Sequence, residues 1–173
     1  MQREVHTFAP VFDAKSRVLV LGSFPSVKSR EQGFYYGHPR NRFWPVLSAV
    51  FGEQVPQTVA EKQAFLHTHG VAVWDVIAGC EIVGSSDASI KNAVPNDLEI
   101  ILSAAPIACI FANGKTAETL YRRLLWPRLQ REIVLLPSTS PANAAWSLPR
   151  LVEAWRVLGE AEVRDRNLLA NKP

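Results

Sequence analysis

The sequence predicts an α/β fold, a three-layer α/β/α sandwich, because apolar runs of strand length alternate with helical patterns from the start of the chain. Short runs such as Ile133-Val134-Leu135-Leu136 are apolar on both faces, as strands covered by helices are. Strands separated by helices pair in parallel through right-handed crossovers. A length of 173 residues and a hydrophobic fraction of 47% fit one domain, residues 1–173, with a core of its own.

The first half of the chain predicts two strands and two helices. We expect a strand over residues 17–23, helices over 42–51 and 59–69, and a strand over 71–76. The stretch from Ala78 to Pro95 has no regular pattern and is expected to be irregular. Its Ser86, Asp87 and Ser89 are consistent with lining a pocket, and Asp87 is equally consistent with capping a turn around Ile90.

The second half continues the alternation. A helix is expected over residues 97–104 with Asn96 as its N-cap, because asparagine favours that position. The pattern then predicts a strand, a helix, a strand, a polar loop and a last helix, at residues 107–112, 115–125, 133–136, 137–146 and 148–159. The tail after Val163 is expected to be a frayed terminus.

Composition restricts the class of protein. The net charge of +3 is compatible with a polyanionic partner but does not demonstrate one. Cys80 and Cys109 are the two cysteines, too few for a four-thiolate iron-sulfur cluster or a cysteine-built zinc site, so we expect reduced thiols, no metal and no cofactor. The sequence shows no signal peptide and no apolar run long enough to cross a bilayer, which predicts a cytoplasmic protein without a membrane partner.

The chemically richest segments are the loops after Leu21, Phe111 and Leu136. Because the carboxyl ends of parallel strands meet at one edge of a sheet, where ligands bind in α/β folds, we expect these three loops to lie together. The side chains of interest are Ser23, Phe24, Tyr35, Tyr36, His38 and Asn41 in the first loop, Asn113 and Lys115 at the second, and Ser138, Thr139, Ser140, Ala142 and Asn143 in the third.

Several residues of the first loop have two interpretations. Phe34, Tyr35 and Tyr36 offer flat faces for stacking a planar ring, or they pack into the core or a lid. His38, which Pro39 holds in an extended backbone, is either a hydrogen-bonding strut or a catalyst. A serine hydrolase is disfavoured because the chain has no G-x-S-x-G motif and His38 has no evident acidic partner.

Two asparagines are ambiguous in the same way. Asn41 and Asn113 each precede a predicted helix and are candidates for capping it. A carboxamide also accepts and donates at once, so either residue is suited to orient a nucleophile or hold a heterocycle edge. Lys115 near a helix N-terminus indicates a nearby phosphate, and the uncharged segment 138–143 is either an ordinary turn or a surface that hydrogen-bonds a phosphate backbone.

Two motifs in order resemble a known family. Gly22-Ser23-Phe24-Pro25, followed by GFYYGHPRNRFW at residues 33–44, is similar to the first motif of mismatch-specific uracil glycosylases, and LPSTSPAN at 136–143 is similar to their second. The chain thus resembles the uracil-DNA glycosylase superfamily, above all its hypoxanthine-DNA (deoxyinosine) glycosylase branch, over most of residues 17–158. The resemblance implies a four-stranded parallel sheet between helices, in agreement with the pattern-based prediction.

The resemblance also implies roles for individual residues. Asn41 falls on the catalytic asparagine of the deoxyinosine branch, whereas Phe24 stands where mismatch-specific uracil glycosylases carry a water-positioning asparagine. Ala142 occupies a position where some members insert a leucine between bases. We expect base contacts from Ser23, Phe24, Tyr36, His38 and Asn113, and DNA contacts from Lys115, Ser138, Thr139, Ser140, Ala142 and Asn143.

The function implied is hydrolysis of the N-glycosidic bond of a deaminated base in DNA, most of all hypoxanthine, after the nucleotide is flipped out of the stack. The partner is then DNA containing a deaminated base, the protein a monomer, and the product an intact abasic site. Two alternatives stay open: a uracil- or xanthine-directed glycosylase of the same superfamily, and a non-catalytic α/β module that binds nucleic acid.

Overall fold

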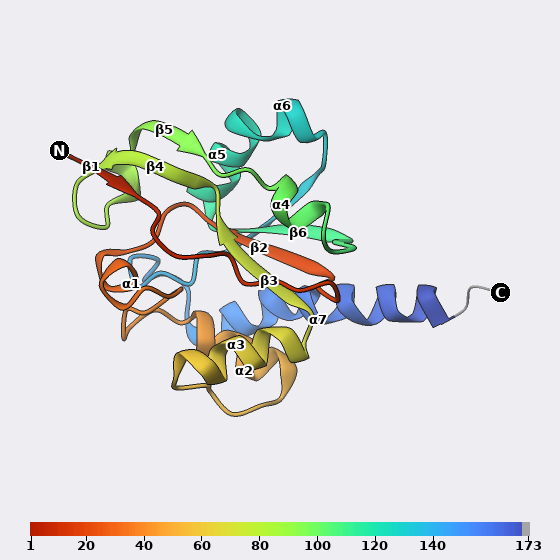
Figure 1. Ribbon diagram of the computed structural model, residues 1–173. Helices are drawn as coiled ribbons and strands as arrows, with labels where there is room; N and C mark the ends of the chain where they lie inside the picture. Colours follow the sequence, from red (N-terminus) through yellow and green to blue (C-terminus); the bar gives the residue numbers. More distant parts are fainter. Residues whose placement is uncertain (171–173) are drawn as a thin grey trace.

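A four-stranded parallel sheet forms the centre of the molecule (Figure 1). The computed structural model describes the backbone of residues 1–170 and the side chains of residues 1–160. The strands are β2 (Val18–Gly22), β3 (Val71–Asp75), β6 (Cys109–Asn113) and β7 (Ile133–Leu136), in the order β3-β2-β6-β7. All three neighbouring pairs are parallel, so the predicted parallel sheet is confirmed.

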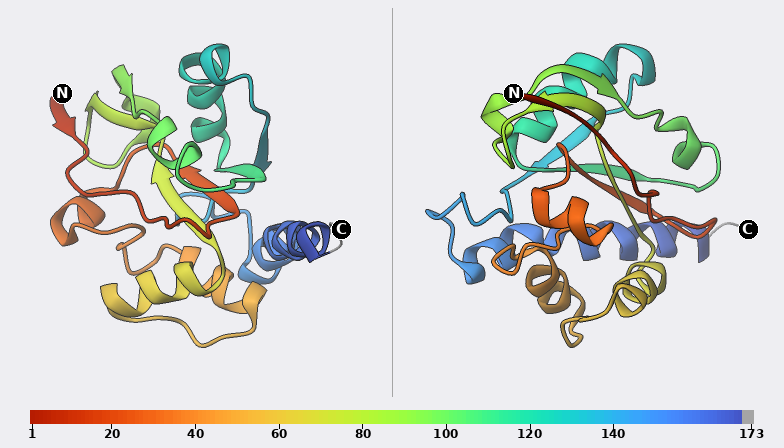
Figure 2. Two further views of the ribbon diagram at one scale, coloured as in Figure 1. Left: turned by 45° about the vertical axis from the view of Figure 1, so that its right-hand side comes forward. Right: turned by 60° about the vertical axis from the view of Figure 1, so that its left-hand side comes forward.

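Helices cover both faces of this sheet, which confirms the three-layer arrangement. On one face lie α2 (Phe43–Phe51), α3 (Val59–Thr68) and α7 (Leu148–Ala170), and on the other α5 (Lys115–Leu124) and α6 (Trp126–Leu129) (Figures 1 and 2). Large apolar side chains from the sheet and the helices fill the space between the layers, among them Leu19, Leu21, Phe43, Phe111 and Trp155, each at most 1% exposed. Burial of this apolar surface is the main stabilising contribution.

A second sheet lies beside the first, and the expectation of an irregular 78–95 stretch is wrong. It is antiparallel, with the order β1-β4-β5, and consists of β1 (Gln2–Val5), β4 (Ile77–Ile82) and β5 (Lys91–Pro95). A short 3-10 turn, η1 (Asp87–Ser89), connects β4 to β5. The two outer strands are mostly exposed and polar, and the β4–β5 register shifts twice, so neither strand leaves an apolar run in the sequence.

Short helices and helix ends also differ from the prediction. α1 (Val27–Gln32) was not expected; the Ser26 side chain caps its start, and Gly33 ends it in the left-handed region at φ 68°. α4 is limited to Glu99–Leu102, and Asn96 is not its N-cap, because its amide donates to the Asp75 carbonyl at 2.9 Å.

The two ends of the sandwich bring further corrections. β7 is an edge strand whose Val134 and Leu135 are 40% and 42% exposed, so the prediction that helices cover both of its faces is wrong. α7 continues to Ala170 and includes the tail that was expected to fray. Among the described residues, no helix is both long and apolar enough to span a membrane.

Candidate active site

The loops after β2, β6 and β7 meet at the carboxyl edge of the parallel sheet, as the sequence predicts. The segments that follow β2 and β7 lie side by side near α1, at the left of Figure 1. Thr139, in the loop after β7, joins all three loops and is 0% exposed. Its side chain therefore lies inside the protein and not on the surface that the sequence analysis assigned to DNA.

Thr139 and Asn113 bind each other through two hydrogen bonds. The Thr139 backbone N–H donates to Asn113 Oδ1 at 3.0 Å, and Asn113 Nδ2 donates to Thr139 Oγ1 at 3.0 Å. Because a backbone N–H can only donate, the first bond fixes which end of the Asn113 amide carries the oxygen. Asn113 therefore holds the loop after β7 in place.

The direction of these bonds also fixes the orientation of Asn41. Thr139 Oγ1 accepts from Asn113, so its own proton is directed to Asn41 Oδ1 at 2.9 Å. The Phe43 backbone N–H donates to the same oxygen at 2.9 Å, so Asn41 binds the first N–H of α2, although the N-cap residue of that helix is Arg42 and not Asn41. No described residue accepts a hydrogen bond from Asn41 Nδ2. The N–H groups of this amide are therefore free to donate to a ligand.

Arg42, which the sequence analysis did not single out, anchors the 137–146 loop. Its guanidinium donates to the carbonyls of Ser140 and Asn143 at 3.0 Å each and to that of Trp146, while its backbone N–H donates to the Thr139 carbonyl. A planar guanidinium supplies several donors at fixed angles, and this suits it to collect carbonyls from one loop. An arginine directly after Asn41 gives no signal in the sequence that it binds a loop about a hundred residues away.

The polar side chains of the 137–146 loop are partly used within the loop itself. Asn143 Nδ2 donates to the Ser138 carbonyl at 2.9 Å, and Ser138 Oγ accepts from the Ser140 N–H at 3.1 Å. Ser140 Oγ accepts from the N–H of Ala142, whose side chain is exposed. The loop is thus a preformed surface with backbone and hydroxyl groups at its exterior.

The three adjacent aromatics of the first loop have different environments. Phe34 and Tyr35 are 5% and 2% exposed and belong to the core, as the packing interpretation predicts. Tyr36 is partly exposed, adopts φ 53°, and stacks one ring face on Phe43 at a centroid distance of 3.9 Å. Phe24 is buried, with the Arg30 guanidinium 5.5 Å from its ring centre, so its ring is a wall of the site and not an open face.

A buried histidine–carboxylate contact lies at the β2–β3 side of the edge. Asp75, the last residue of β3, is 4% exposed, and His6 Nε2 lies 2.8 Å from its carboxylate. Asp75 is paired in register with Gly22 of β2, and a Cβ added to Gly22 would lie 2.4 Å from Asp75 Oδ1. Gly22 is therefore required for the close approach of this carboxylate.

The Tyr36 hydroxyl lies above the same glycine. It is 3.2 Å from the position of a Gly22 Cβ, it is buried, and it has no hydrogen-bond partner of normal geometry among the described residues. Burial raises the pKa of Tyr36 far above its ordinary value, the Asp75 charge raises it further, and the nearby Asn113 amide acts in the opposite direction. Tyr36 is therefore a neutral phenol at physiological pH.

Ser23 extends this charged side to the η1 turn. Its hydroxyl donates to Asp87 Oδ1 at 2.9 Å, and Ser23 itself is 7% exposed. Burial raises the pKa of the Asp87 carboxyl, the Ser23 hydrogen bond lowers it, and the Asp75 charge raises it. Of the two interpretations of Asp87, the structure supports contact with the site.

His38 and Lys115 lie at the margins of the site. His38 is partly exposed, and its Nδ1 accepts from the Arg40 backbone N–H at 3.1 Å, as the strut interpretation predicts. The Lys115 side chain is 75% exposed, with its ammonium 2.5 Å from Glu118. Gly114 before it has φ 96°, and an added Cβ would lie 3.0 Å from that of Ser138, so this glycine permits the close approach of the two loops.

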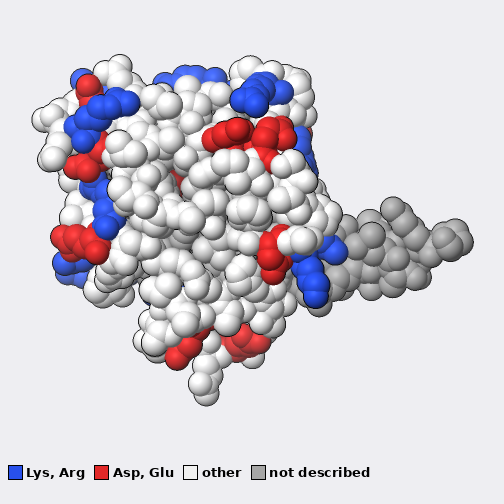
Figure 3. Space-filling model, viewed as in Figure 1, with Lys and Arg blue, Asp and Glu red and all other residues white. Residues whose placement is uncertain are grey.

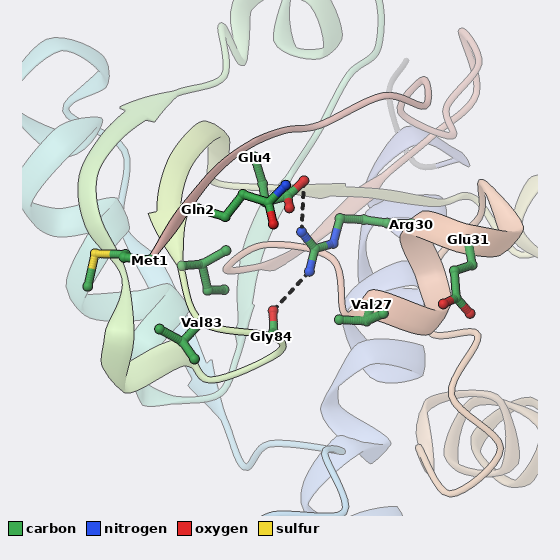
Figure 4. Close-up of a pocket in the computed structure, with 9 residues that line it drawn as sticks. Met1, Gln2, Glu4, Val27, Arg30, Glu31, Val83 and Gly84 are labelled. Carbon is green, nitrogen blue, oxygen red and sulfur yellow. Dashed lines mark hydrogen bonds and ion pairs between the residues drawn. The ribbon is translucent and has the colours of Figure 1, made fainter.

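Three other surface features lie apart from this site. No group of three metal-binding side chains occurs within residues 1–160, and acidic and basic side chains are interspersed on the face seen in Figure 3. A groove of about 600 Å³ lies between β1, α1 and the β4–η1 turn and contains none of the expected site residues (Figure 4). Its lining comprises Met1, Gln2, Glu4, Val27, Arg30, Glu31, Ile82, Val83 and Gly84.

Comparisons with known proteins place the chain in a family. Residues 9–159 match the family model of the uracil DNA glycosylase superfamily. A hypoxanthine DNA glycosylase of Methanosarcina barkeri is 32% identical over 79% of this chain and 86% of its own length. A second hypoxanthine DNA glycosylase, from Methanosarcina acetivorans, is 33% identical over 83% of this chain and 90% of its own.

A solved structure shares the fold. The solution NMR structure of a candidate uracil DNA glycosylase from Methanosarcina acetivorans superimposes with a TM-score of 0.76 at 31% identity, covering 90% of this chain and 96% of that one. The family match spans the three loops and the parallel sheet that positions them. The chain belongs to the uracil DNA glycosylase superfamily.

Proposed function

We propose that this DNA glycosylase removes hypoxanthine from DNA by hydrolysing its N-glycosidic bond and leaves an abasic site. The two hypoxanthine DNA glycosylases named above, matched over most of their length, support the choice of base. The observation that carries the chemistry is the hydrogen-bonded chain from Asn113 through Thr139 to Asn41, which leaves an amide donor free at the meeting point of the three loops.

In this proposal Asn41 stabilises the departing base. Cleavage of the bond between C1′ and the base leaves negative charge on the base and positive charge on the sugar. The Asn41 oxygen already accepts hydrogen bonds from Phe43 and Thr139, so it is not available to accept a hydrogen bond from water. Its Nδ2 donates to an acceptor atom of the flipped purine, and a fixed donor aimed at developing charge is the most effective electrostatic arrangement in catalysis.

The remaining site residues position the nucleotide. Tyr36 stacks on the purine with the ring face opposite Phe43, while Ser23 and Phe24 border the base. His38 lies at the entrance, and Asn113 acts through Thr139 because both ends of its amide are bound there. The pre-shaped backbone around Asn41 removes part of the entropy cost of aligning the reacting groups.

The DNA strand lies along the 137–146 loop in this proposal. Ser138, Ser140 and Asn143 contact phosphates, Ala142 faces the groove, and buried Thr139 holds the loop from inside. Lys115 contacts a phosphate by exchanging its bond to Glu118. We further propose that residues 1–173 form one domain that acts as a monomer without metal or cofactor.

An excision assay tests the proposed function. Purified protein is incubated with otherwise identical duplexes that carry one hypoxanthine, uracil or xanthine, and free base and abasic sites are quantified separately. We expect equal amounts of hypoxanthine and abasic sites, with little uracil release because Phe24 replaces the water-positioning asparagine. Strong uracil release would overturn the choice of base, and DNA binding without any released base would overturn the proposed reaction.

A further inference from the structure

The η1 turn holds Asp87 in a defined position. Arg30 of α1 donates to the Gly84 carbonyl at 2.9 Å, as Figure 4 shows, and the Val27 N–H donates to Ser85 Oγ at 3.0 Å. Within the turn, the Val83 N–H donates to Ser89 Oγ at 2.8 Å. The turn is exposed, yet these contacts fix it against α1, so Asp87 is a positioned side chain.

The Asp87 carboxylate is directed to the end of β2. Ser23, which it contacts at 2.9 Å, lies 64 residues earlier and directly follows the last residue of that strand. Asp87 also acts electrostatically on Asp75 and Tyr36, the two groups that flank Gly22. The turn thus brings a carboxylate to the same sheet edge as the three loops.

The proposed reaction needs an acceptor that the neutral side of the site does not supply. A water molecule that attacks C1′ must lose a proton. Asn41 has a donor free, and the Asn113 and Thr139 side chains are bound to each other. The Tyr36 phenol is neutral and the Asp75 carboxylate is buried beside His6. Asp87 is the carboxylate that combines contact with the site and exposure to water.

We propose that Asp87 is the general base of the glycosylase reaction. This inference rests on the proposed function. One proton of the attacking water passes to the Asp87 carboxylate as the water oxygen bonds to C1′, and the electron pair of the broken glycosidic bond leaves with hypoxanthine. The proton then passes from Asp87 to the departed base or to solvent, which restores the carboxylate. The negative charge also favours the positive charge that develops on the sugar.

The surroundings of Asp87 raise the pH at which its carboxylate takes up a proton. Although Asp87 is exposed as a residue, the surrounding protein partly desolvates its carboxyl and raises its pKa above the ordinary value of 3.8; Asp75 of β3 raises it further, against the opposing Ser23 bond. The other titratable groups nearby are Tyr36 and the Cys80 thiol of β4, and both are neutral because burial raises their pKa. The nearby cation Arg30 is paired with Glu4. Excision therefore slows as pH falls through the raised pKa of Asp87.

Single-turnover excision of hypoxanthine tests the inference. Asp87→Asn keeps an acceptor for Ser23 but removes the base, so we expect the rate to fall about 100-fold or more, with the same loss in Asp87→Ala. Both variants should also lose the decline of the rate at low pH. Ser23→Ala should lower the rate less than Asp87→Asn does. The matched control is Asp97→Asn, on an exposed aspartate of the segment before α4, and it should retain the wild-type rate and pH profile.

The possible outcomes separate the inference from the proposed function. A wild-type rate in Asp87→Asn together with a slow Asp87→Ala would show a structural bond to Ser23 and overturn the inference. An unchanged pH profile in Asp87→Asn would overturn it as well. If Asp87→Ala does not fold, the pH profiles of Asp87→Glu and Asp87→Asn are compared instead. The glutamate variant should retain the decline of the rate at low pH, and the asparagine variant should lose it. Absence of hypoxanthine release from the wild type would instead overturn the proposed function, and the inference with it.

Discussion

The two sides of the active-site edge are built from different chemistry. On the side of β6 and β7, Asn41, Asn113 and Thr139 form a neutral chain whose hydrogen-bond directions are set by backbone N–H groups. On the side of β2 and β3, the Asp75–His6 pair and the Asp87–Ser23 bond bring titratable groups together. The first side keeps its hydrogen bonding over the whole physiological pH range, whereas the second changes with protonation.

In the proposed function, this difference suits the two sides to separate tasks. A neutral amide donates without gaining or losing a proton, and this suits a group that holds a leaving base. A carboxylate changes its proton count, and this suits a group that receives the proton of water. Variants of the neutral side should therefore lower the rate equally at every pH, and variants of the charged side should change the pH profile or the stability.

The strongest test of the neutral side is Asn41→Asp. The carboxylate can still accept from Phe43 and Thr139, but it has no donor and places a negative charge beside the departing base. We expect the single-turnover rate on hypoxanthine to fall about 1,000-fold at neutral pH, where the new carboxyl is ionised, as for removal of a donor at developing charge. A midpoint of thermal unfolding close to that of the wild type would show that the bonds from Phe43 and Thr139 to position 41 survive. A variant with the wild-type rate would contradict the donor role.

The charged side is tested for stability by His6→Ala. His6 and Asp75 are 3% and 5% exposed at their side chains, so removal of one partner leaves a buried charge. We expect the free energy of unfolding to fall by about 3 kcal/mol in urea titrations. His67→Ala removes a comparable pair with Asp13 whose side chains are 40% and 41% exposed, and it should cost about 1 kcal/mol or less. Equal losses in the two variants would contradict a special role for the buried pair.

A smaller effect is expected from Thr139→Val, which keeps the shape of the side chain but removes its hydroxyl. Asn113 Nδ2 and Asn41 Oδ1 each lose a partner, so we expect a loss of about 1 to 2 kcal/mol of stability. The excision rate should decrease by the same factor at pH 6 and pH 8. Thr139→Ser retains the hydroxyl and should keep most of the rate; if it behaves like the valine variant, packing and not hydrogen bonding is responsible.

The smallest effect is expected for Lys115, which belongs to neither the neutral nor the charged side of the active-site edge. Because its side chain is 75% exposed and its ammonium is already paired with Glu118, Lys115→Met should weaken DNA binding only a few-fold at low salt. The slope of log binding constant against log salt concentration should decrease by about one if Lys115 contacts a single phosphate. An unchanged slope in a salt titration of binding to an abasic-site duplex would remove Lys115 from the DNA-contact set.

Local patterns in the sequence predict most of the sandwich and the meeting of three loops. Apolar runs locate all four parallel strands, although only β2, β3 and β6 are largely buried and β7 is a partly exposed edge strand. The mostly exposed β1 and β5, with Lys91 and Asn92 in the latter, leave no such run, and the second sheet was therefore missed.

The candidate site was predictable in its residues but not in its contacts. Asn41, Asn113 and Thr139 were all named, yet the direction of their hydrogen bonds depends on backbone N–H groups that only the fold brings together. His6 and Arg42 bind partners 69 and about a hundred residues away, and sequence spacing carries no sign of either bond. Asp87 had two equal interpretations until the position of Ser23 was known.

The first strand, β1, makes a structural contribution from residues that precede the family-model match. The family match begins at residue 9, but β1 pairs with β4 through Gln2–Val5 and delivers the imidazole of His6 to Asp75. A shortened protein beginning at residue 9 would keep every matched motif and lose the imidazole that lies against the buried Asp75 carboxylate. Boundaries drawn from sequence similarity alone would thus remove the partner of a side chain at the candidate active site.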